Sequence, residues 1–508
     1  MTGNDAKAEI EPMRYRAHII LTAAIMIELL SGAAWRWGVL YLLGVIIYTG
    51  VSYRREINIR MVVTALAVAG TILSTAAAGF SEPERMIRIG LGKNLSSVTL
   101  SASDWRLYDS INQDPVLSGR GEITFQAVMA TEASADANAE GGISTEGAII
   151  KSVSAAGICS RSGPFRLLPG GPNQVMVYAG KRYRGLAEVR LNGKGQLAII
   201  NVLPLEQYLY GVINCEMPAG WSAEALKAQA VVARTYALKN AGKHQVEGFN
   251  LCSDVHCQVY GGLDREHPNG IRAVRETAGE ILAWNGQPID SVFHASCGGY
   301  TEDAANVWAG EVPYLKAVPC STDDPASLKF PLDSLYREFV LIGPWLSDYP
   351  QALCRRSRVY RWRQVLTMPQ AEKLLRDKVP LLSGRNGTGK LMDIRVTERS
   401  PAGRATAVEV VCNNGNYKVE RDRIRSFLGG LKSTLFIIRT VYDKEGRARA
   451  FGFEGGGWGH GVGLCQTGAD GLARAGWKYD AILKHYYQGV SLVKPDAGGE
   501  ECPVFPKS

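Results

Sequence analysis

The sequence has no long run of basic residues interleaved with aromatic ones, although 57 basic and 49 acidic residues give it a formal net charge of +8. The basic residues are instead spread along the chain. Such a mild, dispersed excess suits an anionic polymer or a membrane surface and gives no indication of nucleic-acid binding. We therefore expect no nucleic-acid partner.

Two further signatures are missing. The chain shows no repeat of the solenoid type. The glycine-rich segment GGGWGHGVGLCQTGA, which begins at Gly455, lacks the Lys-Ser/Thr pair of a phosphate loop and the strand–helix context of a dinucleotide site. We therefore expect no nucleotide cofactor.

Cysteine is absent from the first 158 residues, and all ten cysteines follow. The first 80 residues hold three apolar stretches, each near the roughly 20 residues that cross a bilayer. The stretches are HIILTAAIMIELLSGAA from His18, WGVLYLLGVIIYTGVSY from Trp37 and MVVTALAVAGTILSTAAAG from Met61.

Basic residues precede the first apolar stretch, and more of them, within Arg54–Arg60, separate the second from the third. The positive-inside rule then places the N-terminus and the Arg54–Arg60 loop in the cytoplasm and everything after Ser81 outside. Alternatively, the third stretch resembles the apolar region of a signal peptide, with the same outcome. We expect residues 1–80 to form a membrane anchor, with up to three transmembrane spans or a signal-anchor, at the cell membrane. The rest is then extracytoplasmic, where disulfides are possible.

The remaining chain is too long for one ordinary core. Short alternating runs broken by Gly, Asn and Pro predict strands and hairpins over 86–204. A helix is predicted from Ser222, a plausible N-cap, to Asn240, with Gly242 after its end. Its Ala-rich composition implies close packing on more than one side. PQAEKLLRD near Gln370 predicts a second helix.

The expected fold class is α+β, with a strand-rich exported domain around a buried Ala-rich helix. Within an exported domain spanning 86–494 we expect four parts. These are a strand-rich part at 86–204, a part carrying the chemistry at 205–320, an additional α/β part at 325–450 and a Gly-rich, His-containing block at 451–494.

One short segment concentrates soft metal ligands. CSDVHCQVY offers Cys252, His256 and Cys257 within six residues, a set suited to zinc if the segment forms a loop. His244 is the fourth ligand that we favour, with His294 and Cys297 as further candidates. Two alternatives stay open, a Cys252–Cys257 disulfide and a Cys–His thiol nucleophile. Cys297 and Cys320 are candidates for a separate disulfide.

Five blocks, in this order, together resemble the stage II sporulation protein D family, which includes the amidase-enhancer proteins. The resemblance covers roughly residues 86–494. The blocks are EMPAGWSAEALKAQAVVARTYAL from Glu216, CSDVHCQVYGG from Cys252, HASCGGYTEDAANVW from His294, PYLKAV from Pro313 and GGGWGHGVGLCQTGADGLARAGWKYDAILKHYYQGV from Gly455.

The resemblance implies a lytic transglycosylase that cleaves peptidoglycan glycan strands between N-acetylmuramic acid and N-acetylglucosamine, with Glu216 as the catalytic acid. Cleavage of a glycosidic bond needs an acid to protonate the leaving oxygen. One carboxyl group suffices when the sugar's own 6-hydroxyl attacks, which leaves a 1,6-anhydro end. We expect Glu216 at the mouth of a helix, where apolar neighbours raise its pKa. The alternative is a simple helix-end charge.

Residues in the later blocks are candidates to line a glycan groove. Some follow the zinc-ligand segment at alternating positions, some lie in a tight turn and some lie in the Gly-rich loop. The predicted substrate-binding residues are Gln258, Tyr260, Ser296, Gly298, Gly299, Thr301, His460 and Gln466.

The resemblance also implies a second possible function. In the enhancer branch of the family, the chain would be a non-catalytic cell-wall-binding module that stimulates an N-acetylmuramoyl-L-alanine amidase. Some members of the family bind zinc through Cys and His while others lack the cysteines, so the resemblance is compatible with a structural zinc ion as well as with the alternatives above.

Overall fold

The computed structural model describes residues 85–109, 114–129, 148–170, 175–308, 310–322, 352–383 and 389–495. All of them belong to one compact unit, 83–508. The predicted membrane anchor, 1–80, lies outside the described residues. Within the described ranges, no helix is both long enough and apolar enough to cross a bilayer.

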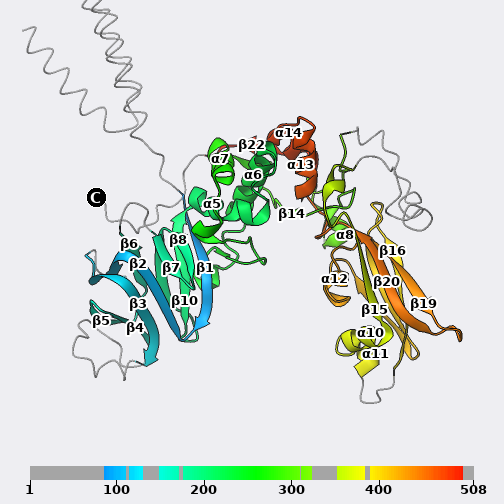
Figure 1. The fold of residues 1–508 in the computed structure, drawn as a ribbon, viewed down its shortest axis with the longest axis horizontal. Helices are drawn as coiled ribbons and strands as arrows, with labels where there is room; N and C mark the ends of the chain where they lie inside the picture. The colour runs from blue at the N-terminus through cyan, green and yellow to red at the C-terminus, as the bar shows by residue number, and fades with distance from the viewer. Residues whose placement is uncertain are drawn as a thin grey trace, which may run out of the picture. The chain divides into compact units, whose positions relative to one another are not determined.

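The first part of this unit is a large sheet (Figure 1). Its main path runs β11-β1-β10-β9-β6-β2-β3-β4-β5, while β7 pairs with β2 and β8. All pairs are antiparallel except β11 and β1, which are parallel with Ile89 opposite Leu251. The strands are β1 Met86–Leu95, β2 Ser97–Tyr108, β3 Leu117–Met129, β4 Ala148–Ser154, β5 Gly157–Arg161, β6 Phe165–Pro169, β7 Val175–Tyr178, β8 Lys181–Arg184, β9 Leu186–Leu191, β10 Leu197–Pro204 and β11 Leu251–Cys252.

Hydrophobic alternation explains why these segments form strands. In β2 every second side chain is buried from Val98 to Ala102, and the alternation resumes at Trp105 after an irregularity in the register. β10 is apolar on both faces except at Asn201 and is almost completely buried. The strands predicted for 86–204 are therefore confirmed.

Three helices follow the sheet: α5 Leu205–Glu216, α6 Ala223–Lys239 and α7 Pro268–Glu276. The helix predicted over Ser222–Asn240 is confirmed as α6, and its Ala and Val side chains are buried on several faces. Ser222 is its N-cap residue, but the side chain forms no capping hydrogen bond. The sequence analysis missed α5, which packs against both α6 and α7.

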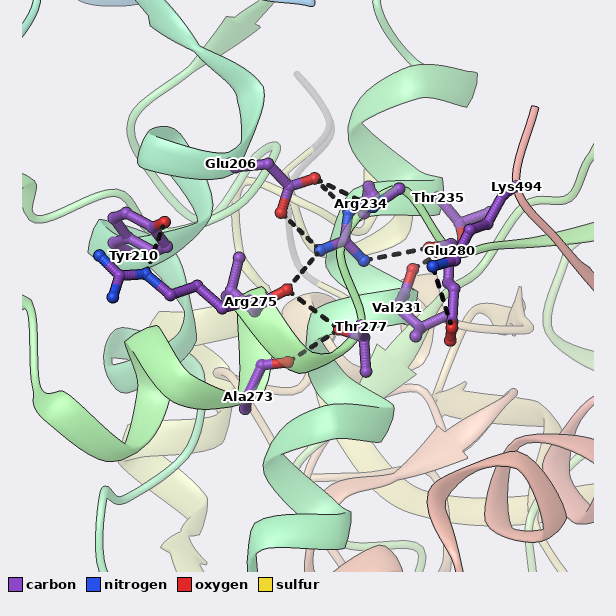
Figure 2. A network of polar contacts seen from close by, with 12 residues as sticks. Glu206, Tyr210, Val231, Arg234, Thr235, Ala273, Arg275, Thr277, Glu280 and Lys494 are labelled. Atoms are coloured by element: carbon purple, nitrogen blue, oxygen red, sulfur yellow. Dashed lines mark hydrogen bonds and ion pairs between the residues drawn. The ribbon is translucent and has the colours of Figure 1, made fainter. Parts of the chain in front are cut away.

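Arg234 links these three helices (Figure 2). Its side chain is 1% exposed and donates two hydrogen bonds of 2.7 Å to the Glu206 carboxylate at the start of α5. It also donates to the backbone carbonyls of Val274 in α7, at 3.2 Å, and Glu280, at 3.0 Å. This ion pair, buried on the arginine side, fixes how α5 lies against α6. Glu216 is at the other end of α5.

A second hydrophobic core lies farther along the chain and includes Trp362, Val408 and Phe451. Two three-stranded antiparallel sheets surround it, ordered β15-β20-β19 and β16-β17-β18. The helix predicted near Gln370 is α10. The elements are β15 Arg361–Thr367, α10 Met368–Leu375, α11 Pro380–Ser383, β16 Leu391–Arg399, β17 Ala405–Cys412, β18 Gly415–Glu420, α12 Arg423–Phe427, β19 Phe436–Tyr442 and β20 Ala448–Gly456.

Short elements complete the unit and bring distant parts of the chain together. The parallel pair β14–β21 places His294 opposite Cys465, and β12 pairs with both β13 and β22. These elements are η1 Gln245–Glu247, η2 Gly262–Arg265, β12 Ile281–Trp284, β13 Gln287–Pro288, β14 Phe293–His294, α8 Ala304–Val307, η4 Leu353–Arg356, β21 Leu464–Cys465, α13 Gln466–Arg474, α14 Tyr479–Tyr486 and β22 Ser491–Val493.

The described residues thus form a mixed α+β fold with strand-rich sheets and few helices, as predicted. The Ala-rich helix α6 is buried within it. The domain boundaries proposed from the sequence remain predictions.

Candidate active site and metal centre

Glu216 is the last residue of α5, followed by the C-cap residue Met217. This corrects the expectation that it lies at the N-terminal mouth of a helix. The C-terminal end of a helix carries partial negative charge, which disfavours a carboxylate. The helix therefore favours the protonated acid, in the same direction as burial.

Burial is the main influence on Glu216 and raises its pKa above the ordinary value of 4.5. Two hydrogen bonds oppose this shift, one from the backbone N–H of Val259 at 3.1 Å and one from the side chain of Gln466. Among the described residues, no other carboxylate contributes to the shift. Glu216 is thus a single, partly desolvated acid.

Several glutamine side chains in this region are buried and form hydrogen bonds. Gln466, the first residue of α13, also donates to Gln229 Oε1 of α6 at 3.4 Å. Gln258 accepts a hydrogen bond from Tyr208 at 3.3 Å. The Nε2 groups of Gln229 and Gln258 have no partner among the described residues. Buried donors usually have partners, and because Gln229 is fully buried and Gln258 is only 1% exposed, an ordered water is the partner that suits each Nε2 group. The burial of Gln258 does not support the expectation that it lines a glycan groove.

The sequence analysis missed Gln229 and Arg234. A signal was present for both, because each is a polar side chain in an otherwise apolar stretch, KAQAVVARTYAL. Buried polar groups in such a helix need specific partners.

Three predicted groove residues lie in the core instead. Tyr260 is 4% exposed and donates to Asn201 at 2.8 Å, while Ser296 and Thr301 are fully buried. Thr301 donates to the Val318 carbonyl at 3.1 Å. The hydrogen bonds give Tyr260 and Thr301 structural roles, and the burial of all three side chains does not support the expectation that they face a groove.

The tight turn at Gly298 and Gly299 serves a different purpose from the one expected. Both have positive φ, +81° and +126°, and a Cβ on Gly298 would lie 2.8 Å from the Gly456 carbonyl carbon. Glycine is needed at position 298 because another stretch of chain approaches the turn, while at position 299 the positive φ alone favours glycine. That close neighbour is the Gly456–Gly457 backbone, where the sequence analysis expected a sugar.

His460 also has its ring nitrogens occupied. Nε2 donates to the Phe293 carbonyl at 2.9 Å, and Nδ1 accepts from the Val462 N–H at 3.1 Å. Burial lowers the pKa of His460 to about 4, so the ring is neutral near pH 7. These bonds position the Gly-rich loop against β14 and leave no ring nitrogen to bind a glycan.

The predicted metal ligands come together. One ligand atom from each of His244, Cys252, His256 and Cys257 lies within 4.8 Å of all the others. Cys257 Sγ is 3.4 Å from His244 Nε2 and 3.7 Å from His256 Nδ1, and Cys252 Sγ is 3.6 Å from His256 Nδ1. Cys252 and Cys257 are free thiols in the structure and form no disulfide.

A carboxylate supports this cluster. Glu247 forms a hydrogen bond with Nδ1 of His244, which leaves Nε2 directed at Cys257. Metal-binding histidines commonly have such a carboxylate partner, because it fixes the tautomer and the ring orientation. Two thiolates and two imidazoles fit one tetrahedral zinc ion.

Two family models match parts of this chain. A family model described as "Stage II sporulation protein" matches residues 193–284, the segment that holds Glu216 and the His/Cys cluster. Another model, described as a domain of unknown function, matches residues 302–463.

Curated relatives agree with the first model. The stage II sporulation protein D of Bacillus subtilis is 31% identical over 310 residues, covering 58% of this chain and 76% of that protein. The corresponding Bacillus amyloliquefaciens protein is 30% identical with the same coverage. The amidase enhancer of Bacillus subtilis is 32% identical over 297 residues, 56% of this chain but only 40% of the enhancer.

Proposed function

This chain belongs to the stage II sporulation protein D family, and on that premise we propose that it acts on the bacterial cell wall as a peptidoglycan lytic transglycosylase. The substrate is the glycan strand, and the bond cleaved joins N-acetylmuramic acid to N-acetylglucosamine. The product carries a 1,6-anhydro end.

The observation that carries this proposal is the environment of Glu216. Burial raises the pKa of Glu216, and among the described residues no neighbouring carboxylate contributes to that shift. Hydrolases that cleave glycosidic bonds generally use two carboxyl groups, one for the leaving oxygen and one for water or a covalent intermediate. A single acid instead suits an intramolecular reaction.

The proposed reaction needs one proton donor that is regenerated. Protonated Glu216 gives its proton to the glycosidic oxygen of the leaving N-acetylglucosamine as the bond to the anomeric carbon breaks. The 6-hydroxyl of the muramic acid residue attacks that carbon, and its proton passes to the Glu216 carboxylate. Gln466 donates a hydrogen bond to the carboxyl group and holds it in place.

The direct test is incubation of the purified full-length chain with glycan strands, followed by mass spectrometry of the products. Anhydro-ended fragments support the proposal. Fragments with reducing ends that carry an added water would indicate hydrolysis, and an unchanged substrate would favour the non-catalytic alternative.

A zinc ion fits the His244–Cys257 cluster in a structural role. All four tetrahedral positions would be taken by protein ligands, which leaves no position for a reactive water. When bound, the ion would close the loop that precedes Val259, and the Val259 N–H contacts Glu216. A bound ion would in this way help to hold the loop that contacts Glu216, while the proton transfer itself would be carried out by Glu216.

The second candidate function is stimulation of a cell-wall amidase. The relative named amidase enhancer favours it. In that case the chain binds peptidoglycan and an N-acetylmuramoyl-L-alanine amidase, and the Glu216→Gln variant stimulates as well as the wild type. Measuring stem-peptide release by the amidase, with and without the chain, distinguishes the two functions.

We also propose that the chain is anchored in the cell membrane by residues 1–80, with the catalytic part outside the cytoplasm. The basic residues that flank the apolar stretches support this orientation. Protease added to intact spheroplasts should digest the part after Ser81. Full protection of that part would contradict this topology.

A further inference from the structure

Four cysteines far apart in the sequence converge in the core. Cys297, Cys320, Cys354 and Cys465 are all 0% exposed, and their four sulfur atoms lie within 4.8 Å of one another. The sulfurs of Cys297 and Cys354 are 3.6 Å apart. This four-cysteine cluster is separate from the His244–Cys257 cluster and takes no part in the proposed reaction.

Each cysteine comes from a different segment. Cys297 precedes the Gly298–Gly299 turn, Cys320 follows a bridge between Tyr300 and Pro319, Cys354 lies in η4 and Cys465 is the N-cap of α13. The Leu353 N–H donates to the Cys320 carbonyl at 2.8 Å, which fixes two of these segments to each other. The cluster is therefore held by backbone contacts as well as by packing.

The spacing of the sulfurs suits one metal ion better than two disulfides. Zinc binds thiolates at about 2.3 Å, so four sulfurs at the corners of a tetrahedron lie about 3.8 Å apart. The 3.6 Å separation of Cys297 and Cys354 is close to that value. A disulfide instead brings two sulfurs to about 2.05 Å and does not require the pairs to converge.

Polar hydrogens point at the sulfurs. The backbone N–H of Cys297 and that of Gly468 donate to Cys465 Sγ at 3.2 and 3.3 Å, and the Gly299 N–H donates to Cys297 Sγ at 3.4 Å. Hydrogen bonds of this kind stabilise negative charge on sulfur, the form in which cysteine binds a metal.

A buried cation adds an independent argument. Arg404 is 1% exposed and donates to the Cys297 carbonyl at 2.7 Å, and its charge interacts with Cys297 and Cys465. Glu302 supplies one opposing charge, but among the described residues Nε and Nη1 of Arg404 have no hydrogen-bond partner. A buried guanidinium in this position is favourable next to a cluster with net negative charge, such as a divalent ion bound by four thiolates.

We propose that Cys297, Cys320, Cys354 and Cys465 bind a second structural zinc ion. The bound ion would join two segments that flank the second hydrophobic core in the sequence. One segment lies just before β15, and the other follows β20. This assignment replaces the Cys297–Cys320 disulfide considered from the sequence, because both thiols are free in the structure and share the cluster with two others.

The experiment uses the full-length chain, produced with its own N-terminal residues and purified without chelator or reductant. Elemental analysis should give about two zinc ions per chain, one from each cluster. Cys354→Ser should lose one of the two. Cys412→Ser is the matched control, because Cys412 is also a buried free cysteine but belongs to neither cluster, and it should retain both.

A second variant keeps the test decisive if Cys354→Ser does not fold. Cys257→Ser removes a ligand of the His244–Cys257 cluster, and X-ray absorption of the remaining zinc should show sulfur ligands alone. Nitrogen ligands on that remaining ion would overturn the proposal. So would a metal-free Cys257→Ser chain whose mass is lighter by the hydrogens lost in forming two disulfides.

Discussion

The Glu216 carboxylate lies 3.1 Å from the backbone nitrogen of Val259, which follows the candidate metal ligand Cys257 by two residues in the sequence. This hydrogen bond joins the end of α5 to the loop that the His244–Cys257 cluster closes. This bond therefore connects the candidate acid to the candidate zinc site. We expect a change at one of the two to alter the surroundings of the other.

Replacement of Glu216 by Gln should reduce glycan cleavage by on the order of a hundredfold or more, the usual contribution of general acid–base catalysis. The amide keeps the shape of the side chain and removes the transferable proton, so folding and glycan binding should change little. Product formation is followed by mass spectrometry. Glu122→Gln, an exposed glutamate on the sheet, is the control and should cleave normally. Normal cleavage by Glu216→Gln would show that Glu216 is only a helix-end charge.

The pH dependence follows from the raised pKa of Glu216. The folded protein holds this proton at pH values where the unfolded chain has released it. The resulting stabilisation is fully present below pH 4.5, the ordinary pKa, and is lost as the pH rises through the folded pKa. The kcat/KM for glycan cleavage should decline as the pH rises through the same interval, because Glu216 must be protonated before it can donate a proton.

Denaturant unfolding of the wild type and of Glu216→Gln at a series of pH values tests this assignment. The stability of the wild type relative to the variant should fall as the pH rises above 4.5. A difference that rises with pH would mean that the Glu216 carboxylate is stabilised by its surroundings.

Glu247 should control metal affinity without being a ligand. Glu247→Ala removes the carboxylate that orients His244, and zinc affinity at this cluster should fall by about 10–100-fold. Competition with a chelator measures the change. Lys93→Ala removes the exposed partner of Glu247 at 2.6 Å and should leave the affinity nearly unchanged. Equal losses in both variants would indicate a general loosening of the loop.

Arg234 should be important for stability (Figure 2). Arg234→Met leaves the Glu206 carboxylate without its partner, and breaking a buried pair costs about 3–5 kcal/mol. Because Glu206 is 33% exposed, we expect a value near the lower end. Urea unfolding gives the difference. Arg182→Met breaks an exposed pair with Asp264 and should cost under about 1 kcal/mol. Similar costs in the two variants would contradict the role assigned to Arg234.

The sequence determined those features that depend on neighbouring residues. Apolar alternation is a local property, and it correctly predicted β1, β2 and β6–β10. It did not single out β3, β4 and β5. The extent of α6 followed from its composition and from the residues at its ends. Cys252, His256 and Cys257 were identified because they lie within six residues of one another.

Only the tertiary structure decided the features that join distant segments. The chain segment of α5 contains aromatic and β-branched residues, and packing against α6 and α7 supports it as a helix. The pairing of Glu206 with Arg234 and the burial of Tyr260 likewise depend on how those elements pack. Cys297 and Cys465 meet across 168 residues of sequence. No local pattern encodes such a contact, because it forms only when the sheets, helices and loops between the two residues have taken their places.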